Sequence, residues 1–357
     1  MSGSTGKSSN RLILPAVIIA ILLVVAIGAG LYLNKGSSST STVTVTAGGS
    51  NTSTGGGSGT VIQIVAAENF WGSLVSQLAG VHGNVTSIVS DPNTDPHEYQ
   101  SNPANAKAIA DAKLVIINGM NYDTWAQLII NASNSPGQTV INVQQVVGIK
   151  SPDTEQTING VTSVVNPHLW YSPFYVNDSI HAFYNALVKI DPTDTSYFNS
   201  NYASLNSSLY HDYMQAEEQI KAQWGGTPYG DGTAKNGTNV AATESIFIFM
   251  ANATGLNVIT PQSFLRAVAE GDDPSPADVA TFQNDLAQGN STVSCLIYNV
   301  QTVTPVTQQL KAEAAQYEIP TTQVSETIQP PNLSFQSWMQ GEVANLANCL
   351  NAAALGQ

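Results

Sequence analysis

The sequence predicts an α/β fold of two lobes with mostly parallel sheets, joined by a long helix and preceded by a transmembrane helix. Two series of short apolar runs alternate with helix-like segments, over residues 61–143 and again over residues 240–354. Such alternation is typical of parallel sheets covered by helices. Between the two series, residues 195–224 keep a helical spacing of apolar side chains. A helix of that length is longer than a crossover within one sheet, so we expect it to run along both lobes.

In the first lobe, short apolar runs rich in β-branched residues are the expected strands: residues 61–66, 85–89, 114–118 and 139–143. Segments with helical spacing are the expected helices: residues 71–78, 103–112, 124–131 and 174–190. The last of these ends at Asp191-Pro192, because proline does not continue a helix. The first lobe, residues 61–191, is therefore expected to be Rossmann-like, with a sheet between helices.

The linking helix belongs to a predicted segment of residues 192–226, and its inward face is apolar or aromatic. That face comprises Tyr202, Leu205, Leu209, Tyr213, Ala216 and Ile220. A turn-rich stretch, residues 225–239, closes the helix. In the second lobe, residues 227–357, the expected strands are 240–243, 258–259, 293–299 and 321–324. The expected helices there are 244–253, 277–288, 306–316 and 335–354.

The N-terminus, residues 1–35, reads as a short cytoplasmic stub and a membrane anchor. Lys7 and Arg11 precede an unbroken apolar run over residues 12–33. A run of about 22 residues spans roughly 33 Å as a helix, which is enough to cross a bilayer. The basic residues favour an inside N-terminus and a body outside the cell. Small residues at 26–30 leave cleavage as a signal peptide open as the alternative.

Residues 36–60 are almost wholly Ser, Thr, Gly and Asn, which predicts a flexible tether. No cysteine lies near the anchor, so we expect no lipid-modified cysteine there. The chain carries nine Asn-X-Ser/Thr sequons, at Asn51, Asn84, Asn131, Asn177, Asn206, Asn236, Asn252, Asn290 and Asn332. Their number suits an exported glycoprotein at the cell surface.

Charge and cysteine content narrow the class of protein. The formal net charge is −14 and no basic patch occurs, which argues against nucleic acid as a partner.

The two cysteines, Cys295 and Cys349, lie in a strand-like run and in the last helix-like segment. In an exported chain they are expected to form a bridge that attaches this helix to its sheet. Two separate buried thiols are the alternative.

Two histidines occur in matching contexts, each directly after a proline and each after a strand-like run. They are His97, in Asp95-Pro96-His97-Glu98-Tyr99, and His168, in Asn166-Pro167-His168-Leu169-Trp170. Imidazole is the commonest protein ligand for transition metals, and the preceding proline stiffens the loop that aims the ring. A Pro-His pair can be only a turn, but two in parallel contexts indicate metal ligation. His82, His181 and His211 lack this context and are interpreted as structural or surface residues.

Two carboxylates occupy equivalent positions in the second lobe. Glu244 follows the strand-like residues 240–243, and Glu326 follows residues 321–324 after one intervening residue. Ligands of open α/β sheets bind beyond the carboxyl ends of strands, so His97, His168, Glu244 and Glu326 are expected to meet between the lobes. The mixed N/O set favours Mn²⁺ or Fe²⁺ and keeps Zn²⁺ open. As alternatives, Glu244 would only begin a helix and Glu326 would be solvated in a polar loop.

Four phrases together resemble the metal-binding solute-binding proteins of ABC importers for zinc and manganese. The first is Thr94-Asp95-Pro96-His97-Glu98-Tyr99, and the second is Ala110-Asp111-Ala112, followed by Asn118-Gly119 and Trp125. The third is Asn166-Pro167-His168-Leu169-Trp170. The fourth is the segment of residues 244–256, which contains Phe247, Phe249 and Gly255-Leu256. The resemblance covers about residues 61–350. It implies two α/β lobes on a rigid backbone helix with one metal between them.

By resemblance, His97 and His168 match the first two ligands of this family. Glu244 matches the third, which is glutamate in many manganese-type members. Glu326 falls at the fourth, usually an aspartate, and is a departure from the pattern. The resemblance also implies that a disulfide between Cys295 and Cys349 has a counterpart in some zinc-type members. Zinc importers of this family often carry histidines in the region that corresponds to residues 148–165. This chain has no histidine there, which favours manganese over zinc as the cargo.

The resulting prediction is a monomeric receptor, not an enzyme, that captures Mn²⁺, with Zn²⁺ or Fe²⁺ as the other candidates, as cargo. It would pass the metal to an ABC permease driven by a cytoplasmic ATPase. Four protein ligands leave little room for a substrate or an activated water. The alternative function is a surface adhesin or surface-layer glycoprotein with a structural metal, suggested by the sequons and the tether.

Overall fold

The computed structural model describes residues 61–94, 96, 99–133, 135–150, 156–158, 161–163 and 166–356. These residues belong to one compact unit. The predicted anchor and tether, residues 1–60, and the predicted ligand His97 lie outside the described residues. Within the described part of the chain, no helix has both the length and the apolar character needed to cross a bilayer.

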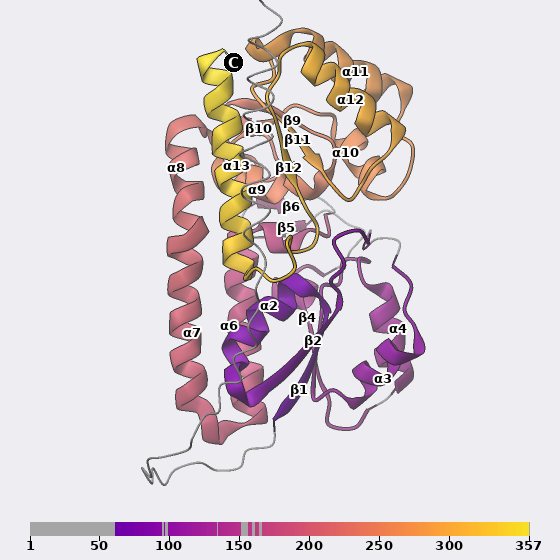
Figure 1. Ribbon diagram of the computed structural model, residues 1–357, viewed down its shortest axis with the longest axis vertical. Helices are drawn as coiled ribbons and strands as arrows, with labels where there is room; N and C mark the ends of the chain where they lie inside the picture. Colours follow the sequence, from indigo (N-terminus) through magenta and orange to yellow (C-terminus); the bar gives the residue numbers. More distant parts are fainter. Residues whose placement is uncertain are drawn as a thin grey trace, which may run out of the picture. The chain divides into compact units, whose positions relative to one another are not determined.

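The first lobe is built on a four-stranded, wholly parallel sheet in the order β2-β1-β3-β4 (Figure 1). Its strands are β1 (Ile62–Glu68), β2 (Gly83–Val89), β3 (Leu114–Ile117) and β4 (Thr139–Asn142). Its helices are α2 (Asn69–Ala79), α3 (Pro103–Asp111), α4 (Thr124–Ser133), α5 (Val143–Val146) and α6 (Pro173–Ile190). All four predicted strands and the four predicted helices are present, within a few residues of the expected bounds.

Side chains of β1 and β3 alternate between two apolar layers. Ile64 and Leu114 face α2 and α6, whereas Val65 and Val115 face α3 and α4. Both faces of the parallel sheet are covered in this way, so β3 and most of β1 are apolar at consecutive positions instead of at every second one. This explains why they appear in the sequence as continuous apolar runs.

The second lobe repeats the same topology, in the order β10-β9-β11-β12, again with every strand parallel. Its strands are β9 (Asn239–Ala242), β10 (Asn257–Val258), β11 (Leu296–Asn299) and β12 (Thr321–Val324). Its helices are α9 (Ile248–Thr254), α10 (Gln262–Ala269), α11 (Pro276–Ala287), α12 (Pro305–Gln316) and α13 (Phe335–Leu355). Helix α10 was not predicted, because a pattern of two turns contains too few repeats to stand out.

Helix starts are marked by a capping residue followed by proline. In four helices the cap side chain accepts a backbone N–H of the first turn, and proline occupies the first position. The four pairs are Asn102-Pro103, Ser172-Pro173, Ser275-Pro276 and Thr304-Pro305. Proline suits this position because its missing N–H would have no partner inside the helix.

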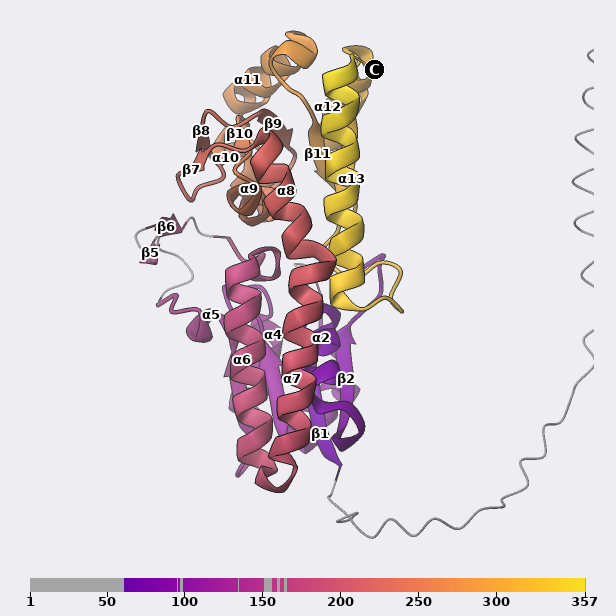
Figure 2. The ribbon, with the colours of Figure 1, turned by 90° about the vertical axis from the view of Figure 1, so that its left-hand side faces the viewer.

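The predicted linking helix is present with the expected bounds, residues 195–224. It consists of α7 (Thr195–Leu209), a π-helical turn η5 (Tyr210–Met214) and α8 (Gln215–Trp224). Figure 2 shows α7 beside α6 of the first lobe, and α8 contacts α9 and α13 of the second. The prediction that this helix runs along both lobes is therefore confirmed, with a π-helical turn interrupting it between them.

A disulfide joins Cys295 to Cys349, as predicted, with their Cα atoms 5.9 Å apart. Cys295 directly precedes β11, and Cys349 lies in α13. The bridge therefore attaches the last helix to the central region of the second sheet.

Two short antiparallel hairpins lie outside the main sheets: β5 (Gln156–Ile158) with β6 (Val161–Ser163), and β7 (Thr227–Pro228) with β8 (Ala234–Lys235). The first of them corrects the interpretation of His168. That residue follows a hairpin strand and not a strand of the first-lobe sheet, because β5 and β6 pair with each other and β4 is the last described strand of that sheet.

Candidate metal centre

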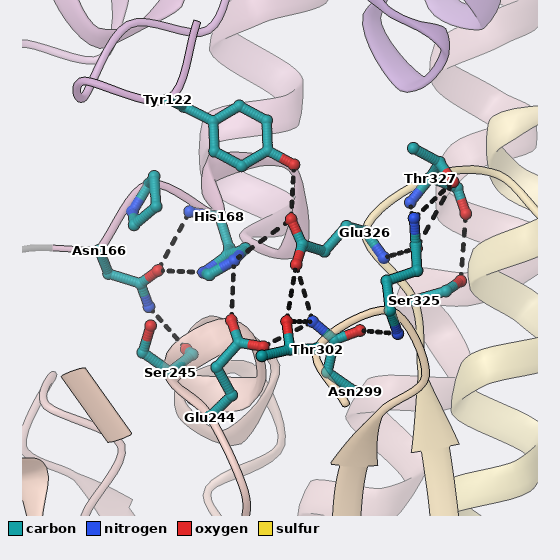
Figure 3. Close-up of polar contacts among 12 residues, drawn as sticks. Tyr122, Asn166, His168, Glu244, Ser245, Asn299, Thr302, Ser325, Glu326 and Thr327 are labelled. Atoms are coloured by element: carbon teal, nitrogen blue, oxygen red, sulfur yellow. Dashed lines mark hydrogen bonds and ion pairs between the residues drawn. The ribbon is translucent and has the colours of Figure 1, made fainter. Parts of the chain in front are cut away.

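Three of the four predicted ligands converge where the ends of both lobes meet (Figure 3). His168 directly precedes a 3₁₀ turn, η3 (Leu169–Tyr171). Glu244 lies two residues after β9 and directly before the turn η6 (Ser245–Phe247), and Glu326 lies two residues after β12. The two carboxylates therefore occupy the carboxyl ends of parallel strands, where α/β sheets bind ligands.

The three side chains form a compact and fully buried cluster. Nε2 of His168 lies 3.2 Å from Oε1 of Glu244 and 4.0 Å from Oε2 of Glu326. One ligand atom from each residue lies within 4.8 Å of the others. None of the three is more than 1% exposed. Glu326, the residue that departs from the family pattern, lies in this cluster and not in a solvated loop.

Asn166 sets the orientation of the His168 ring. Its amide Nδ2 donates to the carbonyl of Ser245 at 2.8 Å, so its Oδ1 is the acceptor on the other side. Oδ1 lies 2.7 Å from Nδ1 of His168 and also accepts the backbone N–H of His168. Nδ1 therefore carries the proton, and Nε2 presents its lone pair toward the carboxylates. This is the arrangement in which a neutral imidazole ligates a metal.

Tyr122 reaches the cluster from the first lobe. Its hydroxyl donates to Oε2 of Glu326 at 2.7 Å. A tight loop presents the ring, since Gly119, Met120 and Asn121 all have positive φ angles, of 78°, 57° and 60°. Asp123 holds this loop by accepting the backbone N–H groups of Asn118 and Gly119.

Gln301 fastens the Glu326 loop to the first lobe. Its Oε1 accepts the backbone N–H groups of Glu326 and Thr327 at 2.7 and 3.1 Å. Its Nε2 donates to the carbonyl of Thr94 at 2.9 Å. On the other side of this loop, the Tyr171 hydroxyl donates to the carbonyl of Ser325 at 2.8 Å. Both lobes therefore contribute to the position of Glu326.

Several carboxyl groups are buried around the cluster. Glu342 accepts hydrogen bonds from Ser325 Oγ and Trp338 Nε1, at 3.1 and 3.0 Å, yet burial raises the pKa of its carboxyl to about 8. Burial likewise raises the pKa of Asp123 to about 6 and the pKa of Glu68 well above its usual range. Desolvation disfavours the charged form, so each of these groups is more easily protonated in the folded protein than in the unfolded chain.

These shifts predict that the metal-free protein becomes less stable as pH rises from about 5 to about 8. Over this range the folded state binds more protons than the unfolded state, so the free energy of unfolding falls with increasing pH. Thermal unfolding of metal-free protein should show a higher melting temperature at pH 5.5 than at pH 8.5. The substitution Glu342→Gln should reduce the loss of unfolding free energy between these pH values by roughly 2–4 kcal/mol.

The exposed residue Glu318 supplies the control, because Glu318→Gln should leave the pH dependence unchanged. Equal slopes for the Glu342→Gln variant and the natural sequence would contradict the assignment of the effect to Glu342.

The remaining histidines lie elsewhere, as predicted. His82 Nδ1 is 2.7 Å from Asp194 Oδ2, the ring of His181 lies tilted to Tyr184 and edge-to-face with Tyr202, and His211 is exposed on η5. None of them belongs to the described cluster around His168.

Three residues that organise the cluster were not predicted: Asn166, Tyr122 and Asn299. Asn166 is part of the Asn-Pro-His phrase, and Asn299 is the last residue of β11. The sequence therefore carried a signal for each: the neighbouring histidine for Asn166, and a polar residue at the end of an apolar strand for Asn299. Tyr122 carried no such signal, because its role depends on Glu326, which is 204 residues away.

Residues 64–349 match a protein family described as ZnuA, zinc-uptake complex component A, periplasmic. The chain belongs to this family. The resemblance inferred from the histidine phrases is thereby confirmed. Members of this family are substrate-binding proteins, which confirms the prediction that the chain is not an enzyme.

Individual relatives are distant. A putative metal-binding protein of Treponema pallidum is 25% identical over 162 residues, which cover 43% of this chain and 51% of the relative. The manganese-binding lipoprotein MntA of Halalkalibacterium halodurans is 23% identical over 198 residues, which cover 56% of this chain and 59% of the relative. The match therefore spans only about half to three fifths of these ZnuA-family relatives.

Solved structures agree in fold over more of the chain. A crystal structure of ZnuA superposes with a TM-score of 0.61 at 18% identity, covering 81% of this chain and 99% of that one. The periplasmic zinc-binding protein TroA of Treponema pallidum superposes with a TM-score of 0.61 at 16% identity, covering 81% of this chain and 98% of that one. These likenesses establish the two-lobe α/β fold of the family for this chain.

Proposed function

We propose that this protein captures one divalent transition-metal ion outside the cell and delivers it to an ABC importer. The observation that carries the proposal is the buried convergence of His168, Glu244 and Glu326 between the ends of the two sheets. Two carboxylates buried this close together are costly unless a cation compensates them. A divalent ion would supply that charge, with His97 as the fourth ligand.

The donor set supports a first-row metal and leaves its identity to experiment. Two carboxylates beside imidazole favour Mn²⁺ or Fe²⁺, and the imidazoles keep Zn²⁺ possible. Relatives are described variously as manganese-binding, iron-binding and zinc-binding. We propose Mn²⁺ as the cargo to test first, with Zn²⁺ and Fe²⁺ as competitors.

The ligand-bearing loops are held by hydrogen bonds from both lobes, which suggests how cargo would be released. Tyr122 and Gln301 link the two lobes at Glu326, and Asn166 links them beside Glu244. The long helix disfavours wide hinge opening, so we propose that release uses small shifts of these loops. The receiving partner would be a permease with its ATPase, and the receptor would act as a monomer.

The remaining predictions complete this proposal. Residues 61–191 and 227–357 would be the two lobes and residues 192–226 the link between them. Residues 1–35 would anchor the protein in the membrane, and residues 36–60 would tether the body at the cell surface. Glycans on the sequons would decorate that surface.

Equilibrium dialysis of metal-free protein against Mn²⁺, Fe²⁺ or Zn²⁺, followed by elemental analysis, tests the function. We expect one ion per chain at pH 7.5 and much weaker binding at pH 5, because protons compete with metal for imidazole. Competition between the three ions would identify the preferred cargo. Absence of saturable binding at pH 7.5 would contradict the proposal.

A further inference from the structure

Asn299 lies between the two carboxylates of the candidate metal centre (Figure 3). It is the last residue of β11 and is only 3% exposed. Its amide nitrogen Nδ2 lies 2.5 Å from Oε2 of Glu244 and 2.7 Å from Oε1 of Glu326. One side chain therefore bridges both predicted carboxylate ligands.

The orientation of this amide is determined by its other end. Oδ1 of Asn299 accepts the backbone N–H of Gln301 at 3.0 Å, which places the NH₂ group toward the carboxylates. An amide nitrogen has two N–H donors, so it can hold both glutamates at once. Thr302 is also close, with Oγ1 at 2.9 Å from Nδ2 and 3.4 Å from Oε1 of Glu326.

The amide engages one oxygen of each carboxylate, and the opposite oxygens face the imidazole. These are Oε1 of Glu244 and Oε2 of Glu326, at 3.2 and 4.0 Å from Nε2 of His168. A hydrogen bond to an ionised carboxylate is stronger than one between neutral groups, so the Asn299 amide holds these two oxygens turned toward itself. Each glutamate is thus presented through a single oxygen.

We propose that Asn299 is a specificity-determining residue, which restricts Glu244 and Glu326 to one metal-binding oxygen each. The inference rests on the proposed function and deepens it. With His168 and the proposed fourth ligand His97, monodentate carboxylates would give a four-coordinate site. Zinc is usually four-coordinate in protein sites, whereas manganese favours six oxygen-rich ligands. Asn299 therefore offsets the preference for Mn²⁺ that two carboxylates would otherwise create.

Tyr122 contacts the other oxygen of Glu326. Its hydroxyl donates to Oε2, the oxygen that faces His168, while Asn299 donates to Oε1. Both oxygens of this carboxylate are therefore oriented by hydrogen bonds. An ion bound through Oε2 alone would meet only the Tyr122 hydroxyl, whereas an ion bound through both oxygens would also have to displace the Asn299 amide.

The substitution Asn299→Ala tests the proposal by releasing the second oxygen of each glutamate. Dissociation constants for Mn²⁺ and Zn²⁺ should be measured by competition for the natural sequence and the variant. We expect the ratio of the two constants to shift at least about tenfold in favour of Mn²⁺. The matched control is Asn345→Ala, at an exposed position on α13, which should leave the ratio unchanged.

Cobalt(II) supplies a readout of coordination number that does not depend on affinity. Four-coordinate Co²⁺ absorbs visible light much more strongly than six-coordinate Co²⁺. The natural sequence loaded with Co²⁺ should give the strong four-coordinate band, and Asn299→Ala should give a several-fold weaker one. If the alanine variant does not fold, Asn299→Ser, which keeps a single donor, replaces it. This variant should shift the ratio of dissociation constants toward Mn²⁺ and weaken the Co²⁺ band, each to a smaller extent than expected for alanine.

The outcomes separate this inference from the function on which it rests. A natural protein that binds Co²⁺ in six-coordinate form would overturn the inference and leave metal capture intact. So would an equal loss of affinity for Mn²⁺ and Zn²⁺ in the variant, since that is what a merely structural residue would produce. A natural protein that binds none of these ions would refute the proposed function itself, and the inference with it.

Discussion

Replacing His168 with alanine is expected to weaken binding of the preferred metal ion at least about a hundredfold. The imidazole is fully buried, and Asn166 orients its Nε2 toward both carboxylates. Alanine removes this ligand and leaves a cavity in place of the imidazole. The measurement is a competition titration of metal-free protein with a chromophoric chelator at pH 7.5.

His211→Ala is the matched control, because His211 is exposed on η5 and outside the cluster. It should bind metal as tightly as the natural sequence. The His168→Ala protein should also show the far-ultraviolet circular dichroism of the natural protein, so that lost affinity reflects a lost ligand. Undiminished affinity in a folded His168→Ala protein would place the metal site elsewhere.

Loss of the disulfide is expected to lower the free energy of unfolding by about 4 kcal/mol. This is the conformational entropy that a cross-link closing a loop of this length removes from the unfolded chain. The bond joins residues 54 positions apart and links the start of β11 to α13. Without it the unfolded chain gains conformational freedom, while the folded contacts of α13 stay. The double substitution Cys295→Ser and Cys349→Ser should be compared with the natural protein by guanidinium denaturation under non-reducing conditions.

Reductant supplies the internal control for this comparison. The natural protein in dithiothreitol should approach the stability of the double variant, whereas the variant itself should not respond to dithiothreitol. If the double variant unfolded at the same denaturant concentration as the oxidised natural protein, the bridge would make no contribution to stability.

The two pH effects in this protein oppose one another. Acidification favours the protonated forms of buried carboxyls such as Glu342, and so stabilises the metal-free fold. It also protonates imidazole and so weakens metal binding. We therefore expect the metal-bound protein to lose its stability advantage over the metal-free protein as pH falls toward 5. This makes the comparison at pH 7.5 the informative one for cargo preference.

The sequence by itself determined most of the elements that carry the site. Apolar runs predicted the strands of both sheets, and helical spacing predicted the linking helix at residues 195–224 with the bounds seen in the structure. These features were readable because strand burial and helical periodicity are local properties of the chain. The position of Glu244 just beyond the end of a strand was equally local.

Only the tertiary structure decided how those residues act together. The place of Glu326 depends on Tyr122 and Gln301, and the tautomer of His168 depends on the bond from Asn166 to Ser245. The role of Asn299 depends on two glutamates 55 positions before it and 27 positions after it. Such contacts join distant parts of the chain, and no periodicity or neighbouring residue encodes the direction in which an amide or a hydroxyl points once the lobes have packed.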